Sequence, residues 1–239
     1  MLPAIGDKVE KIPLIDCVLP LTIAVVVLPI ADTPKLGRAW IMDNLPDIVS
    51  KRDPAITVRR ILKVNHAGEF GAIRIYGAQI WMARRLFPDI VPALQDMRED
   101  EIRHCRLFRE AMPPRSARPC RVMGFWSLGG FVLGFLTALG GRNMVWICTE
   151  AVESTVHRHL EDQLAFVKNR DPELHALIAS IQDEELAHLR EAEEKQTGRG
   201  LAHKLLLPVI GALTDLMIWL STWGDSSWMR AEIARSGKA

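Results

Sequence analysis

The chain has 239 residues, a length that suits one domain with appendages rather than several compact domains. Its formal net charge at pH 7 is only +1, and no dense run of basic residues with interleaved aromatics occurs, which argues against nucleic acid as a partner. The cysteines are widely spaced, which argues against a zinc ribbon, a thioredoxin-type motif or a disulfide framework and favours reduced, mostly buried thiols: Cys17, Cys105, Cys120 and Cys148.

Residues 1–55 differ in composition from the rest and contain an apolar run from Leu14 to Ile30. This run is interrupted by Asp16, Pro20 and Pro29. A spanning helix needs about 20 apolar residues and tolerates proline poorly, so a simple span is not expected here. An N-terminal extension that dips into a membrane, a targeting segment and an over-long start of the chain remain open alternatives.

Beyond this zone the hydrophobic periodicity is helical and strand-like alternation is scarce, which predicts an all-α protein. Pro113 and Pro114 are expected to end the second helical segment, and Gly198 the fourth. Asp171 followed by Pro172 is typical of a helix start, with aspartate as the N-cap. The four amphipathic segments run at about Pro54 to Arg85, Asp89 to Glu110, Asn143 to Asn169 and Asp171 to Gln196.

Two further segments are strongly apolar, Phe125 to Leu139 and Leu201 to Trp223. The first is uncharged, too short to cross a bilayer upright, and long enough to lie in its surface. The second contains Pro208 and Asp215 and carries tryptophans towards its end, and indole rings favour the membrane interface. We therefore expect two interfacial helices; packing on the bundle or on a partner subunit is the alternative.

Glutamate and histidine recur at a helical spacing. Among the seven histidines, only two have a glutamate three residues earlier, and residues at that spacing share one helix face. A further glutamate lies 32 residues before each of these two glutamates, and a shift of 84 residues superimposes the two sets. The predicted metal ligands are Glu69, Glu101, His104, Glu153, Glu185 and His188.

A separation of 32 residues corresponds to a helix, a turn and part of a return helix, so each half is expected to form a helical hairpin. Two such hairpins, with Glu on one arm and Glu-x-x-His on the other, make the ferritin-like four-helix bundle that holds two iron ions. The carboxylate-rich set suits iron or manganese better than zinc. We expect Glu69 and Glu153 to lie on neighbouring helices and to approach the same two ions.

Other polar residues flank the predicted ligands. His157 and His159 follow Glu153 and are candidates for proton delivery. Tyr76 lies about two helical turns after Glu69, where a radical-generating protein would place a tyrosine. Acidic residues that either orient the histidines or form exposed helix charge precede both Glu-x-x-His pairs: Glu99, Asp100, Asp183 and Glu184.

Around these residues the sequence resembles the demethoxyubiquinone hydroxylases of ubiquinone biosynthesis. The resemblance extends from about Arg59 to Trp223. Its more specific parts are the A-G-E-x-G-A motif at Ala67 to Ala72 and the region from Trp126 to Gly141. The segments that carry it closest to the ligands are 65–72, 100–104, 151–153 and 183–188.

This resemblance implies a membrane-associated mono-oxygenase that hydroxylates a polyprenyl benzoquinol with O2 and electrons from NADH. The six predicted ligands would then hold two iron ions, and His159 would take part in reduction. Leu160 stands where many relatives have tyrosine, which argues against a tyrosine-assisted electron relay at this position. No G-x-G-x-x-G motif occurs, so NADH would bind in an unusual way or act through a partner.

The leading hypothesis is a ferritin-like di-iron bundle over residues 56–232, with interfacial helices at about 125–139 and 201–223, that hydroxylates a demethoxyubiquinone intermediate. Its expected partners are the quinone, O2, membrane lipid, other ubiquinone-biosynthesis proteins and a second copy of the chain. We expect it on the cytoplasmic face of a bacterial inner membrane or the matrix face of the mitochondrial inner membrane. A ferroxidase or iron-storage bundle, a radical-generating subunit and a non-enzymatic scaffold are the alternatives.

Overall fold

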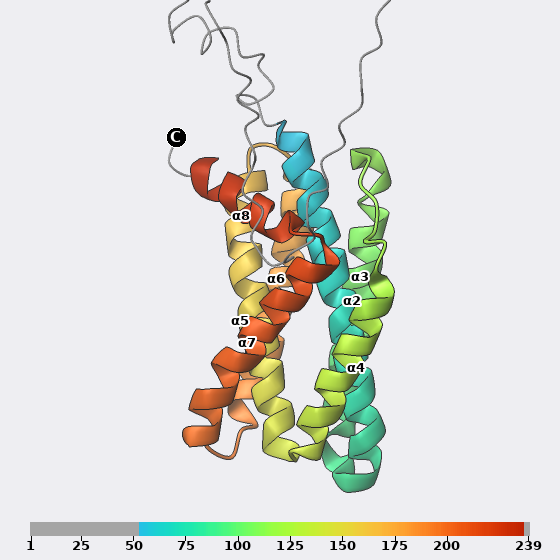
Figure 1. Ribbon diagram of the computed structural model, residues 1–239, viewed down its shortest axis with the longest axis vertical. Helices are drawn as coiled ribbons and strands as arrows, with labels where there is room; N and C mark the ends of the chain where they lie inside the picture. The colour runs from blue at the N-terminus through green and yellow to red at the C-terminus, as the bar shows by residue number, and fades with distance from the viewer. Residues whose placement is uncertain (1–52, 237–239) are drawn as a thin grey trace, which may run out of the picture. The chain divides into compact units, whose positions relative to one another are not determined.

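The computed structural model describes residues 53–236, and within this range it contains helices and no strand (Figure 1). The prediction of an all-α four-helix bundle is confirmed. The sequence features noted before residue 53 lie outside the described residues. The four bundle helices are α2 (Pro54–Leu86), α3 (Val91–Glu110), α5 (Arg142–Val167) and α6 (Pro172–Glu194).

The bundle is built from two helical hairpins. In the first hairpin α2 packs against α3, and the short 3-10 turn η1 (Pro88–Ile90) connects them. In the second hairpin α5 packs against α6. Asp171 begins α6 as predicted, because its carboxylate accepts a hydrogen bond from the Leu174 amide at 3.0 Å. The same carboxylate binds Arg115, in the turn η2 (Pro113–Arg115) after the first hairpin, at 2.6 and 2.8 Å.

A second layer covers one side of the bundle. Figure 1 shows α4 (Met123–Leu139) and α7 (Leu201–Ser221) in front of α2 and α5, and the two covering helices contact each other. Two glycines of α4 let it approach α2 closely: a side chain at Gly130 or at Gly134 would overlap a carbonyl oxygen of α2. In the part of the chain that the structure describes, one stretch is long and apolar enough to cross a membrane, His203–Leu220.

Two helix ends and one whole helix differ from the prediction. Helix α6 ends at Glu194, two residues before the predicted Gln196; beyond this end Gln196 donates to Glu150 at 2.6 Å and the Thr197 amide donates to Asn143 at 2.8 Å. Helix α7 ends at Ser221, before the predicted Trp223. The short helix α8 (Asp225–Ser236), which packs on α2 and α5, was not predicted.

The core consists of apolar residues above and below one polar layer. On each bundle helix the predicted ligands fall between two sets of buried apolar residues. Ile61, Phe108, Leu160 and Ile178 are among those on one side, and Tyr76, Met97, Trp146 and Ala192 among those on the other. The ligand layer is therefore enclosed by packed side chains.

Candidate metal centre

The structure brings all six predicted ligands together in the middle of the bundle. Every bundle helix contributes, because α2 and α5 each carry one glutamate and α3 and α6 each carry a Glu-x-x-His pair. The side chains are almost fully enclosed, with exposed fractions between 0% and 6%. They are Glu69, Glu101, His104, Glu153, Glu185 and His188.

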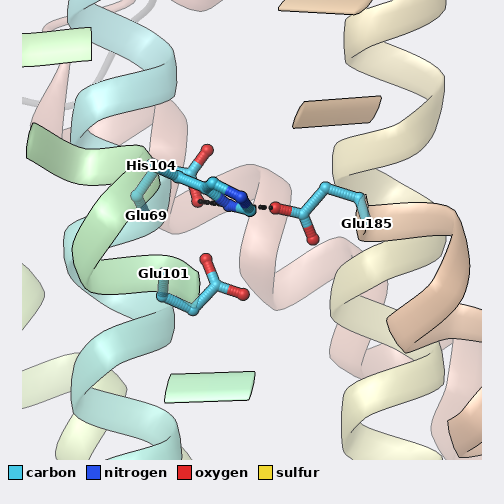
Figure 2. Close-up of side chains that lie close together, drawn as sticks. All are labelled: Glu69, Glu101, His104 and Glu185. Carbon is cyan, nitrogen blue, oxygen red and sulfur yellow. Dashed lines mark ion pairs between the residues drawn. The ribbon is translucent and has the colours of Figure 1, made fainter. Parts of the chain in front are cut away.

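These side chains form two overlapping groups of four, and in each group the potential ligand atoms lie within 4.8 Å of one another. Glu101 and Glu185 belong to both groups. Glu69 and Glu153 fall in different groups, whereas the sequence led us to expect that they approach the same two ions. The groups are Glu69, Glu101, His104 and Glu185, drawn in Figure 2, and Glu101, Glu153, Glu185 and His188.

Both histidines are oriented by a carboxylate of the opposite hairpin. His104 Nε2 lies 2.6 Å from Oε2 of Glu184, and His188 Nε2 lies 3.1 Å from Oδ2 of Asp100. With Nε2 directed at these carboxylates, each ring faces the cluster with Nδ1, the atom that would bind a metal ion once deprotonated. The Nδ1 atoms of His104 and His188 accordingly lie 2.9 and 3.6 Å from the carboxylate oxygens of Glu185.

Arg103 connects the two orienting carboxylates. Its guanidinium donates to Glu184 at 3.0 and 2.7 Å and also pairs with Asp100. The hydrogen bond from Arg103 holds the pKa of Glu184 below its ordinary value. Glu99 and Asp183, the other two flanking acids, are exposed. Two of the four acids thus orient the histidines, and the other two are surface charge.

Burial and mutual repulsion dominate the electrostatics of the cluster. Burial, reinforced by Glu185, raises the pKa of Glu69 to about 7 and those of Glu101 and Glu153 well above their ordinary values. Burial lowers the pKa of His104, but contacts with Glu185 and Glu69 outweigh it and raise that pKa to about 9. Burial would raise the pKa of Glu185 as well, yet its contacts with the histidines hold it below the ordinary range.

The donor set fits a metal ion. Several of its buried atoms have no hydrogen-bond partner: Nδ1 of His104 and of His188, Oε1 of Glu101, and both carboxylate oxygens of Glu185. A buried polar atom without a partner costs about 1–3 kcal/mol, so atoms converging in this way suit a cation. Carboxylate oxygens with one imidazole per group match the preference of iron and manganese.

Tyr76 contacts the cluster from α2. Its hydroxyl donates to Oε1 of Glu153 at 2.6 Å, and both side chains are buried. Burial, together with Glu153, raises the pKa of Tyr76 well above its ordinary value, so the hydroxyl remains a donor at neutral pH. From the sequence we considered Tyr76 only as a radical site; its spacing from Glu69 gave no signal of a bond to Glu153.

The two other candidate histidines lie outside both groups. His159 is buried on α5, and its Nε2 lies 3.0 Å from Oδ1 of Asp215 on α7. Arg230 of α8 donates to the same oxygen at 3.1 Å. His157 lies nearer the surface, 3.5 Å from Glu161. Their proposed roles in proton or electron delivery stay predictions.

An apolar groove of about 400 Å³ runs between α2, α4, α5 and α7. Ala72, Ile75 and Val152 line the groove and also a small void behind it, whose wall includes Tyr76. This void is too small for a water molecule, so the side chains around it separate the groove from the Tyr76–Glu153 hydrogen bond and the cluster. Its outer wall includes Phe125, Trp126, Leu128, Leu133, Leu213 and Met217.

The sequence is similar to known proteins over most of its length. The family model described as "Ubiquinone biosynthesis protein COQ7" matches residues 56–221. The chain is 36% identical over 168 residues to the mouse "NADPH-dependent 3-demethoxyubiquinone 3-hydroxylase, mitochondrial", covering 69% of this chain and 76% of that protein. It is 34% identical over 185 residues to the Rhodospirillum rubrum "3-demethoxyubiquinol 3-hydroxylase", covering 77% and 85%. It is 29% identical over 175 residues to the yeast "5-demethoxyubiquinone hydroxylase, mitochondrial", covering 67% and 75%.

Proposed function

Because the chain belongs to the ubiquinone biosynthesis protein COQ7 family, we propose that it is an oxygen-dependent hydroxylase of a demethoxyubiquinone intermediate. The family is the one that the sequence resembles. The observation that carries the proposal is the buried carboxylate and histidine cluster together with an apolar groove whose wall includes Gly68 and Val152, the chain neighbours of Glu69 and Glu153. A polyprenyl quinone needs an apolar path for its tail, and its ring needs a reactive centre at the end of that path.

The two groups of side chains would hold a pair of iron ions. Glu69 and His104 would bind one ion, Glu153 and His188 would bind the other, and the shared glutamates would bridge them. Bound iron would supply the activation of O2, of which one oxygen atom enters the ring and the other leaves as water with two electrons and two protons from the reductant. The shared glutamates are Glu101 and Glu185.

The residues around the cluster orient its ligands and exclude water. Glu184 and Asp100 fix the two imidazole rings, and Tyr76 fixes the Glu153 carboxylate by donating to one of its oxygens. The packed apolar residues above and below the cluster keep bulk water from the oxygen chemistry. Ala72 and the other groove residues would offer the quinone ring an apolar approach from the side of α2 and α5, through side chains that must move to admit it.

Electrons are proposed to come from a reduced nicotinamide nucleotide. The mouse relative is named NADPH-dependent, whereas the sequence led us to expect NADH. His159 is the candidate for assisting the reduction. It lies six residues after Glu153 on α5 and is held by Asp215.

The membrane is the proposed source of the substrate. Large apolar side chains are exposed along α4 and α7, and a water-insoluble tail could pass from the bilayer into the groove between these helices. We propose a peripheral location on the cytoplasmic face of a bacterial inner membrane or the matrix face of the mitochondrial inner membrane. Other ubiquinone-biosynthesis proteins and a second copy of the chain are further proposed partners. The exposed residues include Phe125, Leu128, Phe131, Leu136, Leu213, Leu216 and Leu220.

The test is product formation under isotopically labelled O2. The iron-loaded protein is given a demethoxyquinol and a reductant, and the product is analysed by mass spectrometry. One labelled oxygen atom should enter the ring, and replacing Glu101 or Glu185 by Ala should abolish its entry without loss of helix content. Iron oxidation without a hydroxylated product would contradict the proposal and favour a ferroxidase.

A radical-generating protein is a second candidate, since the Tyr76 hydroxyl lies 2.6 Å from a carboxylate oxygen of the cluster. A stable tyrosyl radical signal that disappears in Tyr76→Phe would favour it. Hydroxylation at an undiminished rate in the same variant would exclude a required radical at Tyr76.

A further inference from the structure

A basic pocket of about 400 Å³ lies near one end of the bundle, away from the metal cluster. Its walls come from the first turns of α2, from the loop before α4, and from the turn between α7 and α8. One acidic residue, Asp225, is among its lining residues. The cationic lining residues are Arg59, Arg60, Lys63, Arg118 and Arg121.

Asp225 neutralises only part of this charge. It forms an ion pair with Arg60 at 3.1 Å and another with Lys63. The remaining three arginines form no ion pair with any residue that the structure describes: Arg59, Arg118 and Arg121. The pocket therefore keeps an excess of positive charge, carried by guanidinium groups that suit a phosphate.

The basic pocket continues into the apolar surface of α4 and α7. Arg121 lines the pocket, and four residues later Phe125, with 68% of its surface exposed, lines the apolar groove. On α7, Ile218 lines the groove, and five residues later Trp223 lines the pocket with 79% of its surface exposed. Both chain segments thus pass directly from charged to apolar surroundings.

We propose that this pocket binds the phosphate headgroup of an anionic phospholipid, whose acyl chains lie along the exposed faces of α4 and α7. A soluble phosphate compound would account for the arginines but not for the exposed apolar residues that adjoin them. An anionic lipid matches both, because its charge and its chains are joined in one molecule. The proposal goes beyond hydroxylation, and it adds a preference for anionic lipid to the proposed membrane contact.

The test compares binding of the iron-loaded full chain to vesicles of phosphatidylcholine with and without phosphatidylglycerol. The wild-type protein should bind the anionic vesicles more tightly. Each basic residue near an anionic surface contributes about a fivefold gain, so Arg118→Gln with Arg121→Gln should weaken this binding about 25-fold. Binding to neutral vesicles, iron content and turnover of a tail-less quinol should not change in this double variant.

The matched control replaces two exposed arginines of α3 and α6, Arg106→Gln with Arg190→Gln, and so removes the same net charge elsewhere. This control should lose less than about half of the anionic preference. An equal loss of anionic-vesicle binding in both double variants would mean that the whole protein surface attracts the membrane diffusely. That result would overturn the proposal of a lipid-binding pocket. Equal binding of the wild type to both vesicle types would also overturn the lipid-pocket proposal, but it would not contradict the proposed hydroxylation or membrane contact.

A second arm separates a lipid headgroup from a soluble phosphate. Inorganic phosphate is titrated into the protein by calorimetry without vesicles. We expect no saturable binding at micromolar concentrations. Saturable micromolar binding that is lost in the Arg118→Gln, Arg121→Gln variant would assign the pocket to a soluble phosphate compound and contradict the lipid proposal.

Discussion

His104 of the first hairpin is hydrogen-bonded through Nε2 to Glu184 of the second hairpin at 2.6 Å. The shift of 84 residues that relates the two ligand sets also relates Glu184 to Asp100, which lies 3.1 Å from Nε2 of His188. Each hairpin therefore orients the candidate metal-binding histidine of the other. The complete site exists only when the two hairpins are packed together.

The first prediction concerns this crossed orientation. Glu184→Gln and Asp100→Asn should each weaken iron binding by about 10- to 100-fold, because the imidazole loses the carboxylate that fixes its tautomer. Helix content should not change, since both side chains lie at the edge of the site. Iron titration followed by absorbance measures the effect. Asp183→Asn and Glu99→Gln are matched controls at exposed positions, and an equal loss in these controls would refute the orienting role.

The second prediction is that the metal-free protein loses stability as the pH rises. Burial raises the pKa of Glu69 from 4.5 to about 7, so between these values the folded state holds a proton that the unfolded chain has released. Contacts with Glu185 and Glu69 outweigh burial and raise the pKa of His104 from 6.5 to about 9. The stability that protonated His104 contributes is therefore lost as the pH rises between these two values. The contacts of Glu185 with the histidines lower its pKa, so its contribution to stability increases with pH. This increase is complete above about pH 5 and does not affect the range considered.

The melting temperature of the metal-free protein should therefore be on the order of 5 °C higher at about pH 5.5 than at about pH 8. Glu69→Gln should reduce this difference, because the variant lacks one of the titrating groups. Iron-loaded protein should show the opposite trend, since the ligands bind iron only when deprotonated. A melting temperature of the metal-free protein that increases over this range would contradict the electrostatic description.

The third prediction concerns Tyr76→Phe. Loss of the hydrogen bond to Glu153 should weaken binding of the ion held by Glu153 and His188 by about 10- to 150-fold, since a hydrogen bond to a charged group contributes about 1.5–3 kcal/mol. The ion held by Glu69 and His104 should be unaffected. A stepwise iron titration that separates the two ions tests this. Equal weakening of both steps would show that Tyr76 acts on the cluster as a whole.

The fourth prediction concerns the exposed apolar faces of α4 and α7. Phe131 and Leu216 are 46% and 49% exposed and do not line the groove. Phe131→Glu with Leu216→Glu should release the protein from vesicles and depress turnover of a long-tailed quinol far more than that of a tail-less one. The control is Leu86→Glu with Ile102→Glu, at exposed apolar positions of α2 and α3. Equal loss on both substrates would refute entry from the membrane.

The bundle helices could be predicted because they are long, amphipathic and capped by local sequence, as at Asp171. Helix α8 could not, since Met229 and Ile233 are its buried apolar residues and make no extended periodic pattern. Its first residue, Asp225, pairs with Arg60, 165 residues away. Contacts between such distant parts of the chain, rather than local periodicity, position this helix.

The clustering of the six candidate ligands could be predicted from spacing, because positions three residues apart share a helix face in any helix. The surroundings of the ligands could not be predicted in the same way. The bond from Tyr76 to Glu153 joins residues 77 positions apart that meet only when α2 and α5 pack together. Likewise, the sequence shows acids before each Glu-x-x-His pair but not that Asp100 contacts the histidine of the other hairpin.

The most direct test of the central claim is anomalous X-ray diffraction from crystals of the iron-loaded protein, recorded at the iron absorption edge. We predict two anomalous peaks in the bundle core, one beside Glu69 and His104 and the other beside Glu153 and His188, with Glu101 and Glu185 in contact with both. A single peak, or peaks away from these six side chains, would contradict the di-iron site on which the proposed hydroxylation depends.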